Sequence, residues 1–267
     1  MYDYHVHSTF SGDSKMSMIS AVEKSIEVGL KEIVFTDHLD IFWPDQLNVY
    51  ERIQPKKYHN LIEKAKKLYG NQISIKKGLE IGIQPHSIIE TNNFLKGWDY
   101  DFIILSIHCV DKIDVSQKMF YLRQSSYETF KRYYEEVLFA VKEFQTYNVL
   151  GHLDLIRRHI PNPSYKKPFY SEFYEIIDQI FKILINKNKG IEVNTSGYRY
   201  GLDTFMPDFD LIKRYRELGG KIITVGSDAH STEYIGYKIN EAIELIKQAG
   251  FEHITLFDNM NPHFCNI

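Results

Sequence analysis

The sequence predicts an α/β protein whose parallel strands form a closed or nearly closed barrel. Short runs of Val, Ile, Leu and Phe alternate along the whole chain with longer segments in which apolar residues recur at helical spacing. This alternation indicates parallel strands joined by crossover helices, and the chain holds enough units to close a barrel. A length of 267 residues suits one barrel domain, so we predict a single domain over residues 1–267.

The strand and helix signals can be assigned to ranges in chain order. Strands are predicted at 2–7, 32–36, 74–81, 102–107, 149–150, 190–193, 221–225 and, more weakly, 254–257. Helices are predicted at 18–28, 58–69, 126–144, 169–186, 208–218 and 233–249. Two long loops are predicted, at 42–55, where Trp43 and Pro44 are candidates for a substrate lid, and at 157–168.

The composition is that of an ordinary globular protein, with 43% hydrophobic and 25% charged residues. The net charge of -3 gives no electrostatic footprint for nucleic acid. Cys109 and Cys265 lack the number and spacing of a disulfide framework. The start of the chain has no signal-peptide pattern, and no apolar stretch has the length of a membrane helix. We therefore expect a cytoplasmic protein that needs no nucleic acid, membrane or obligate protein partner.

Residue types that ligate metals recur where the predicted strands end. His5 and His7 close the first strand, and residues two apart on a strand point to the same side. In barrel enzymes the active site lies at the carboxyl ends of the strands. Such repetition at one rim is typical of a multi-metal hydrolase. The other ligand-type residues at or just after strands are Asp13, Asp37, His38, Glu80, His108, His152, Asp228 and His230.

Glu80 carries the strongest single signal of this set. It lies inside the apolar run 77–83, where an unpaired charge would cost several kcal/mol. Its partner should therefore be a cation. A Lys or Arg salt bridge would explain Glu80 taken alone, whereas the histidines at the same rim favour metal ions.

Six short motifs resemble, in chain order, those of the polymerase-and-histidinol-phosphatase (PHP) superfamily. They are Tyr4-His5-Val6-His7-Ser8, Phe35-Thr36-Asp37-His38, Gly78-Leu79-Glu80, Ser106-Ile107-His108, Gly151-His152-Leu153-Asp154 and Gly226-Ser227-Asp228-Ala229-His230. The match runs from the first strand to the last, and the length and motif layout are similar to the stand-alone histidinol-phosphate phosphatases. The resemblance implies a distorted (β/α)7 barrel, similar to a TIM barrel, with three metal ions at the carboxyl ends of its strands.

The resemblance also implies a distribution of ligands among the three ions. One ion would take His5, His7, Glu80 and Asp228; a second would take His108 and His152 and share Glu80; the third would lie between Asp13, His38 and His230. Many relatives have a histidine where this chain has Asp13. Imidazole and carboxylate ligands without thiolate suit zinc, manganese or iron, and we place zinc first. Asp37, being adjacent to His38, should face away and orient a ligand.

The metal constellation predicts hydrolysis of a phosphate monoester, and the resemblance implies that this substrate is L-histidinol phosphate, in histidine biosynthesis. We expect a hydroxide between the first two metals to attack phosphorus, with Asp228 or His230 as candidate acids for the leaving group. Phosphate binding favours arginine, and the loops at the rim hold Arg157, Arg158 and Arg199, of which we expect the last two to act in catalysis as well. The candidate carboxylates for the substrate's ammonium and imidazole are Asp40, Asp111 and Asp154.

Three alternative functions remain open at this point. A phosphodiesterase or exonuclease of the same superfamily would need a basic groove that binds nucleic acid, and the near-neutral net charge does not favour one. A protein-tyrosine phosphatase would use related chemistry. A non-catalytic metal-binding module, with a regulatory role, would keep its fold-stabilising metal and show no hydrolysis.

Overall fold

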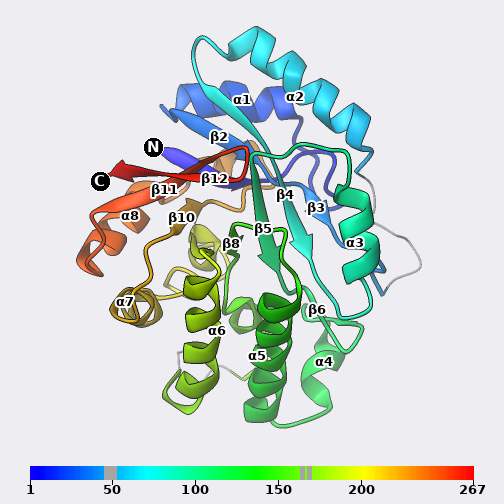
Figure 1. Ribbon diagram of the computed structural model, residues 1–267, viewed down its shortest axis with the longest axis vertical. Coiled ribbons are helices and arrows are strands. Elements are labelled where there is room, and N and C mark those ends of the chain that lie inside the picture. The colour runs from blue at the N-terminus through cyan, green and yellow to red at the C-terminus, as the bar shows by residue number, and fades with distance from the viewer. Residues whose placement is uncertain (45–52, 163–165, 167–169) are drawn as a thin grey trace.

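The structure is a computed structural model that describes residues 1–44, 53–162, 166 and 170–267. Within these ranges, parallel strands lie side by side in their order along the chain, and the helices lie outside them (Figure 1). Each strand is thus hydrogen-bonded to its neighbour in sequence, as right-handed crossover units produce. The barrel strands are β1 (Tyr2–Val6), β2 (Glu32–Phe35), β4 (Ser74–Gly82), β5 (Phe102–Ser106), β8 (Val149–Leu150), β9 (Gly190–Asn194) and β10 (Ile223–Gly226).

The barrel is nearly closed between its first and last strands. A single parallel bridge joins Val6 to Ala229. His7 N donates to Ala229 O at 2.9 Å, and Ala229 N donates to His5 O at 3.3 Å. The β1–β2 register shifts between Asp3 and Val6, and the short strand β3 (His38–Leu39) pairs with β4 beyond the end of β2. These features confirm the predicted distorted (β/α)7 barrel.

The helices begin and end close to the predicted ranges where capping signals are strong. Ser17 caps α1 by accepting from Ser20 N, and Ser125 forms a capping box with Glu128 at the start of α5. Two predicted helices begin later, because the segments 170–172 and 232–234 are 3₁₀ turns. The helices are α1 (Met18–Glu27), α2 (Pro55–Tyr69), α3 (Ile88–Leu95), α4 (Lys118–Leu122), α5 (Ser126–Glu143), α6 (Tyr174–Asn186), α7 (Phe209–Glu217) and α8 (Ile239–Gln248); α3 and α4 were not predicted.

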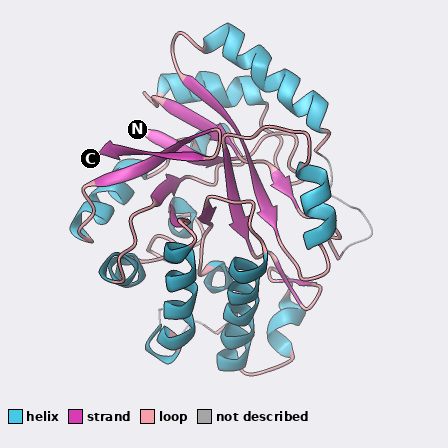
Figure 2. Cartoon of the chain, in the orientation of Figure 1, coloured by secondary structure: helices cyan, strands magenta, loops and turns pink. Residues whose placement is uncertain are grey.

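The run 254–257, predicted as a weak barrel strand, has a different place in the fold. It lies in β11 (His253–Asp258), which pairs antiparallel with β12 (Asn261–Asn266) and stands apart from the barrel ladder (Figure 2). Phe257 of this hairpin packs in a buried cluster with Tyr4 and Phe102 of the barrel strands. The hairpin therefore extends the apolar core instead of adding a barrel strand.

A larger apolar core fills the space between the strands and the surrounding helices. Alternate residues of the strands point into it, such as Ile103 and Leu105 of β5, while Ser106 of the same strand faces the polar interior near Glu80. Among the described residues, no helix combines the length and apolar character needed to cross a bilayer.

Candidate active site

Glu80, on β4, lies at the centre of a group of buried histidines. Its Oε2 is 3.1 Å from His5 Nε2, 3.4 Å from His7 Nε2 and 3.0 Å from His38 Nδ1. Asp228 completes the group, because its Oδ1 is 3.4 Å from His7 Nε2 and 3.8 Å from His5 Nε2. Four of these side chains form the set expected around one metal ion.

The other oxygen of Glu80 faces a second pair of histidines. Glu80 Oε1 is 2.7 Å from His152 Nε2 and 3.1 Å from His108 Nε2, and it accepts a hydrogen bond from Ser106 Oγ at 2.7 Å. His108 follows β5 and His152 follows β8. One carboxylate thus presents each of its oxygens to a different set of imidazole nitrogens, as a ligand bridging two ions must.

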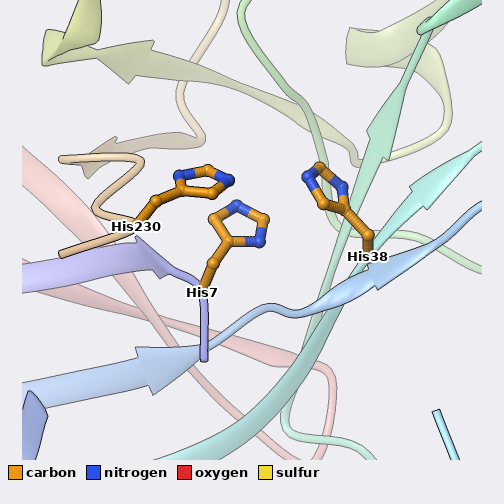
Figure 3. Close-up of side chains that lie close together, drawn as sticks. All are labelled: His7, His38 and His230. Carbon is orange, nitrogen blue, oxygen red and sulfur yellow. The ribbon is translucent and has the colours of Figure 1, made fainter. Parts of the chain in front are cut away.

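Three histidine rings from different elements form a third group next to the first (Figure 3). The ring of His7 lies between the other two, 4.1 Å from that of His230 and 4.3 Å from that of His38. Asp13 Oδ2, on the first loop, is 3.1 Å from His230 Nε2 and 3.6 Å from His38 Nε2. The structure therefore brings all the predicted ligand residues to one rim.

The donor set at this rim fits divalent metal ions. Among the described residues, His5 Nε2, His7 Nε2, His230 Nε2 and Glu80 Oε2 are buried without a hydrogen-bond partner. An unprotonated imidazole nitrogen and a carboxylate oxygen are both acceptors, so neither can satisfy the other. A cation between them satisfies both, and nitrogen and oxygen ligands without thiolate suit zinc, manganese or iron.

The carboxylates and imidazoles of the group compensate one another's charges. Burial alone would lower the pKa values of His5, His38 and His108, but the neighbouring carboxylates raise them, so these rings carry protons that a bound cation would replace. Burial alone would raise the pKa of Glu80, but the neighbouring imidazoles of His5, His108 and His38 hold it well below its usual range. The pKa of His7 is lowered well below its usual value, first by burial and then by the charges of nearby histidines. An ionised carboxylate and a neutral imidazole are the forms that bind metals.

Asp37 faces away from the cluster, as its position next to His38 predicts. Its Oδ1 accepts from Ser8 N at 2.6 Å and from Ser11 Oγ at 2.7 Å, and its Oδ2 accepts from Ser8 Oγ. Ser11 Oγ lies 2.9 Å from His7 Nδ1. Asp37 thus fixes the first loop and, through Ser11, the ring of His7.

Asp40 is not where a substrate-binding carboxylate should be, which corrects our expectation. It is buried, and its Oδ1 is 2.8 Å from His108 Nδ1. A Cβ at position 82 would lie 1.7 Å from this oxygen, so Gly82 provides its space. Asp40 therefore contacts Nδ1 of His108, whose other ring nitrogen faces Glu80, and it does not line the cavity described below.

Arg157 and Asp154 are also misplaced for substrate binding, and this prediction is corrected as well. Arg157 is 1% exposed, and its Nη1 donates to Asp154 Oδ2 at 2.7 Å. The remaining guanidinium nitrogens donate to Lys166 O, within the second predicted loop. The other parts of that loop, at 163–165 and 167–168, lie outside the described residues. Asp111, the third candidate carboxylate, is exposed and pairs with Arg132.

Arg158 and Arg199 both lie beside Asp228 at the rim, but of the two only Arg158 lines the cavity described below. Arg158 lies against the ring of Tyr200, and its Nη1 is 3.4 Å from Asp228 Oδ2. Arg199 Nη2 donates to the backbone oxygen of Asp228 at 2.8 Å, and its guanidinium lies over the ring of Tyr234. Asp228 itself has a φ of 56°, a left-handed conformation that costs an aspartate about 1 kcal/mol. Both arginines therefore contact the strained residue that follows β10.

A cavity of about 310 Å³ opens above the histidine cluster. Its wall beyond the cluster contains Trp43, Asp114 and Tyr200, together with Arg158. Trp43 belongs to the predicted lid 42–55, of which residues 45–52 lie outside the described residues. Asp114, on the hairpin of β6 (Cys109–Val110) and β7 (Ile113–Asp114), was missed because no local pattern marks it. Glu192, inside the apolar strand β9, carried the same signal as Glu80 and was also missed.

A (β/α)7 barrel with buried imidazoles on both oxygens of one carboxylate, beneath a cavity, is the arrangement of a metal-dependent hydrolase. Residues 3–196 match the family described as the PHP domain. The chain belongs to this PHP family, as the order of its motifs indicates.

Several relatives match the chain over nearly its whole length. The histidinol-phosphatase of Lactococcus lactis subsp. lactis is 36% identical over 97% of this chain and 94% of the relative. A probable histidinol-phosphatase of Clostridium acetobutylicum is 28% identical over 95% of this chain and 96% of the relative. The crystal structure of a Lactococcus lactis histidinol phosphate phosphatase, complexed with zinc, L-histidinol and phosphate, covers 98% of both chains with a TM-score of 0.91 and 33% identity.

Proposed function

We propose that this protein is a histidinol-phosphatase, which hydrolyses L-histidinol phosphate to L-histidinol and phosphate in histidine biosynthesis. The observation that carries the proposal is the similarity, over 98% of both chains, to a phosphatase crystallised with zinc, L-histidinol and phosphate. The histidinol-phosphatase at 36% identity supports the same reaction. We also propose that residues 1–267 form one domain. Two expectations stay predictions: that the protein is cytoplasmic, and that it has no nucleic-acid, membrane or obligate protein partner.

The site would hold three divalent ions, with zinc as the first choice. His5, His7, Glu80 and Asp228 would hold the first ion. His108 and His152, with Glu80 shared, would hold the second, and Asp13, His38 and His230 the third. Ions in such a site lower the pKa of water and stabilise negative charge that develops on phosphoryl oxygens.

The chain's own residues would divide the remaining tasks. Arg158 lines the cavity, and its planar guanidinium would bind phosphate oxygens there. Arg199 contacts the backbone of Asp228 and would hold that loop in place. Burial opposes ionisation of Asp228, but the charge of His5, a hydrogen bond from His7 and further positive charge hold its pKa well below the usual range. Asp228 is therefore ionised at neutral pH and carries no proton for the leaving group. His230 would be the acid only if its Nε2 carried a proton instead of holding the third ion.

The cationic end of the substrate needs a carboxylate outside the metal cluster. Among the described residues, the cavity is lined by the carboxylates of Asp13, Glu80, Asp114 and Asp228, and three of these belong to the cluster. Asp114 remains, and we assign it to the ammonium or imidazole of histidinol phosphate. Its oxygens accept from Ser116 N and Ser116 Oγ, both at 2.7 Å, which fixes the carboxylate while leaving further lone pairs for a ligand.

The test is phosphate release by zinc-reconstituted protein from four substrates: L-histidinol phosphate, an aryl phosphate, a phosphotyrosine peptide and a phosphodiester. We expect kcat/KM for histidinol phosphate to exceed the others by several orders of magnitude. Preference for the peptide or the diester would replace the proposal with one of the other phosphatase functions. A zinc-loaded protein without turnover on all four would favour a non-catalytic module.

A further inference from the structure

Glu192 lies behind the metal cluster and touches two of its histidines. Its side chain is buried in strand β9, and it is absent from the cavity wall. Glu192 Oε1 is 2.6 Å from His5 Nδ1. Glu192 Oε2 accepts from the backbone nitrogen of His152 at 2.9 Å and from Asn194 Nδ2 at 3.2 Å. The carboxylate therefore links one ligand of the first ion to the chain segment of a ligand of the second.

Every partner of Glu192 is a hydrogen-bond donor. The His152 partner is a backbone N–H. The amide of Asn194 is oriented by its own Oδ1, which accepts from Ser196 N at 3.0 Å, so that Nδ2 turns toward Glu192. His5 Nε2 faces Glu80 Oε2 at 3.1 Å, so a metal-binding His5 carries its proton on Nδ1. Because both oxygens of Glu192 must accept, a glutamine there would turn its NH₂ group toward a donor in either orientation.

A glycine leaves the space that this carboxylate occupies. A Cβ at position 226, on β10, would lie 2.5 Å from Glu192 Oε1 and 2.3 Å from His5 Cβ. A Cβ at position 151 would be in ordinary contact with Glu192 Oε2, at 3.4 Å, but would lie 2.8 Å from Ser106 Oγ, which donates to Glu80. A side chain at position 226 would therefore displace Glu192 and His5, and one at position 151 would displace the hydroxyl that contacts Glu80.

We propose that Glu192 is a positioning residue of the metal centre. It holds His5 in the tautomer with a proton on Nδ1, aims His5 Nε2 at Glu80 and Asp228, and anchors the backbone at His152. Carboxylates that accept from the second nitrogen of a ligand histidine raise its basicity and fix its ring, and their loss costs about 10- to 100-fold in metal affinity or activity. The proposal rests on the metal binding in the proposed function but is independent of the substrate.

The first experiment measures zinc affinity by competition with a chromophoric chelator, without substrate. We expect Glu192→Gln to weaken zinc binding at one or more sites by about 10- to 100-fold, and Glu192→Asp, which keeps the charge, to lose less. The matched control is Glu32→Gln, since Glu32 is a buried strand carboxylate that accepts from the hydroxyls of Tyr4 and Ser74, away from the cluster. The control should bind zinc as the unmodified protein does. Wild-type affinity in a folded Glu192→Gln variant would overturn the proposal.

A second experiment needs no variant and so does not depend on how Glu192→Gln folds. In zinc-loaded protein labelled with ¹⁵N-histidine, long-range NMR correlations identify which ring nitrogen of each histidine carries the proton. We expect His5 to carry it on Nδ1, in a strong hydrogen bond, with Nε2 bound to metal. A His5 that binds metal through Nδ1 would overturn the proposal. Both measurements stand whether or not histidinol phosphate is the substrate, so their failure is distinct from failure of the proposed function.

Discussion

Arg158 lies over the ring of Tyr200, with its guanidinium carbon 3.5 Å from the centroid of the ring. Both residues line the cavity, and Arg158 Nη1 is also 3.4 Å from Asp228 Oδ2. A guanidinium over an aromatic face gains about 0.5–2 kcal/mol, depending on its exposure to water. Tyr200 therefore holds the proposed phosphate-binding arginine above the metal cluster.

Replacing either member of this pair should weaken catalysis. Arg158→Ala removes a charged hydrogen-bond donor, and we expect kcat/KM for histidinol phosphate to fall by about 10- to 150-fold. Tyr200→Ala should lower it by about 3- to 30-fold, because the arginine loses its support. Tyr200→Phe keeps the aromatic face and is the control, with near wild-type rates. Steady-state kinetics check this, and a Tyr200→Ala enzyme with unchanged kcat/KM would contradict the supporting role.

Asp114→Asn should change binding of the substrate more than its turnover. Loss of the charge that faces the substrate cation should raise KM for histidinol phosphate by about 10-fold with little change in kcat, since a charged hydrogen bond contributes about 1.5–3 kcal/mol. The matched control is Asp111→Asn on the same hairpin, because Asp111 is exposed and pairs with Arg132. An aryl phosphate without a cationic group should be hydrolysed equally by the variant and the unmodified enzyme. If KM for both substrates rose together, Asp114 would not be the residue that binds the cationic group of histidinol phosphate.

Arg157→Ala should destabilise the protein, because Asp154 would lose the partner of its buried charge. Removing one member of a buried ion pair costs about 3–5 kcal/mol, and the pair here is 1% and 0% exposed. Urea unfolding monitored by circular dichroism measures the change in free energy. Lys24→Met, which breaks an exposed pair with Glu27, should change it by less than about 1 kcal/mol. A loss of substrate affinity in Arg157→Ala at unchanged stability would instead restore the substrate-binding role first predicted for Arg157.

The parts of the site that the sequence could predict are those that depend on strand ends. The carboxyl ends of parallel strands lie at one edge of the barrel, whatever the order of the strands. His5 and His7 at the end of one strand, and Glu80 within another, therefore lie at the same rim. The barrel fold was predictable from the alternation of strand and helix signals along the chain. The antiparallel pairing of 254–257 was not predictable, since an apolar run does not indicate its partner.

The direction in which loop residues face could not be read from the sequence. Arg157 and Arg158 are adjacent, yet one is buried against Asp154 and the other lines the cavity. Asp40 reaches His108 only because position 82 has no side chain, and that condition involves two distant segments. Such outcomes depend on which groups meet after the barrel has closed, and local patterns carry no information about them.

Asp208 should make stability depend on pH between about 4 and 7. Burial, and then the charge of Asp154, raise the pKa of Asp208 to about 7 in the folded protein, against an ordinary value of 3.8. The folded state therefore binds this proton more tightly, so the group's stabilising contribution is complete below pH 4 and is lost as the pH rises toward 7. Asp208→Asn should remove this loss and stabilise the protein at pH 8 by about 1–2 kcal/mol, allowing for partial exposure.

Asparagine is a matched replacement at this position because Asp208 caps α7 by accepting from Leu211 N, and Asn and Asp cap helices equally well. Urea unfolding of both proteins at several pH values checks the prediction. The difference in unfolding free energy should be small at pH 4, grow toward pH 7 and then level off. Parallel curves across this range would show that Asp208 has an ordinary pKa in the folded state.

Removal of metal should lower both activity and stability, because the buried acceptors of His5, His7 and Glu80 then face one another without a cation. A ligand that binds only the folded state stabilises it by RT ln(1 + [L]/Kd), about 2.7 kcal/mol at 100 times Kd. Dialysis against a chelator should therefore abolish phosphate release and lower the melting temperature, and zinc should restore both. His152→Asn, which removes one nitrogen facing Glu80, should fold, bind less zinc and lack turnover. If the dialysed protein kept its melting temperature and activity, or His152→Asn stayed active, the cluster would not be the catalytic metal centre.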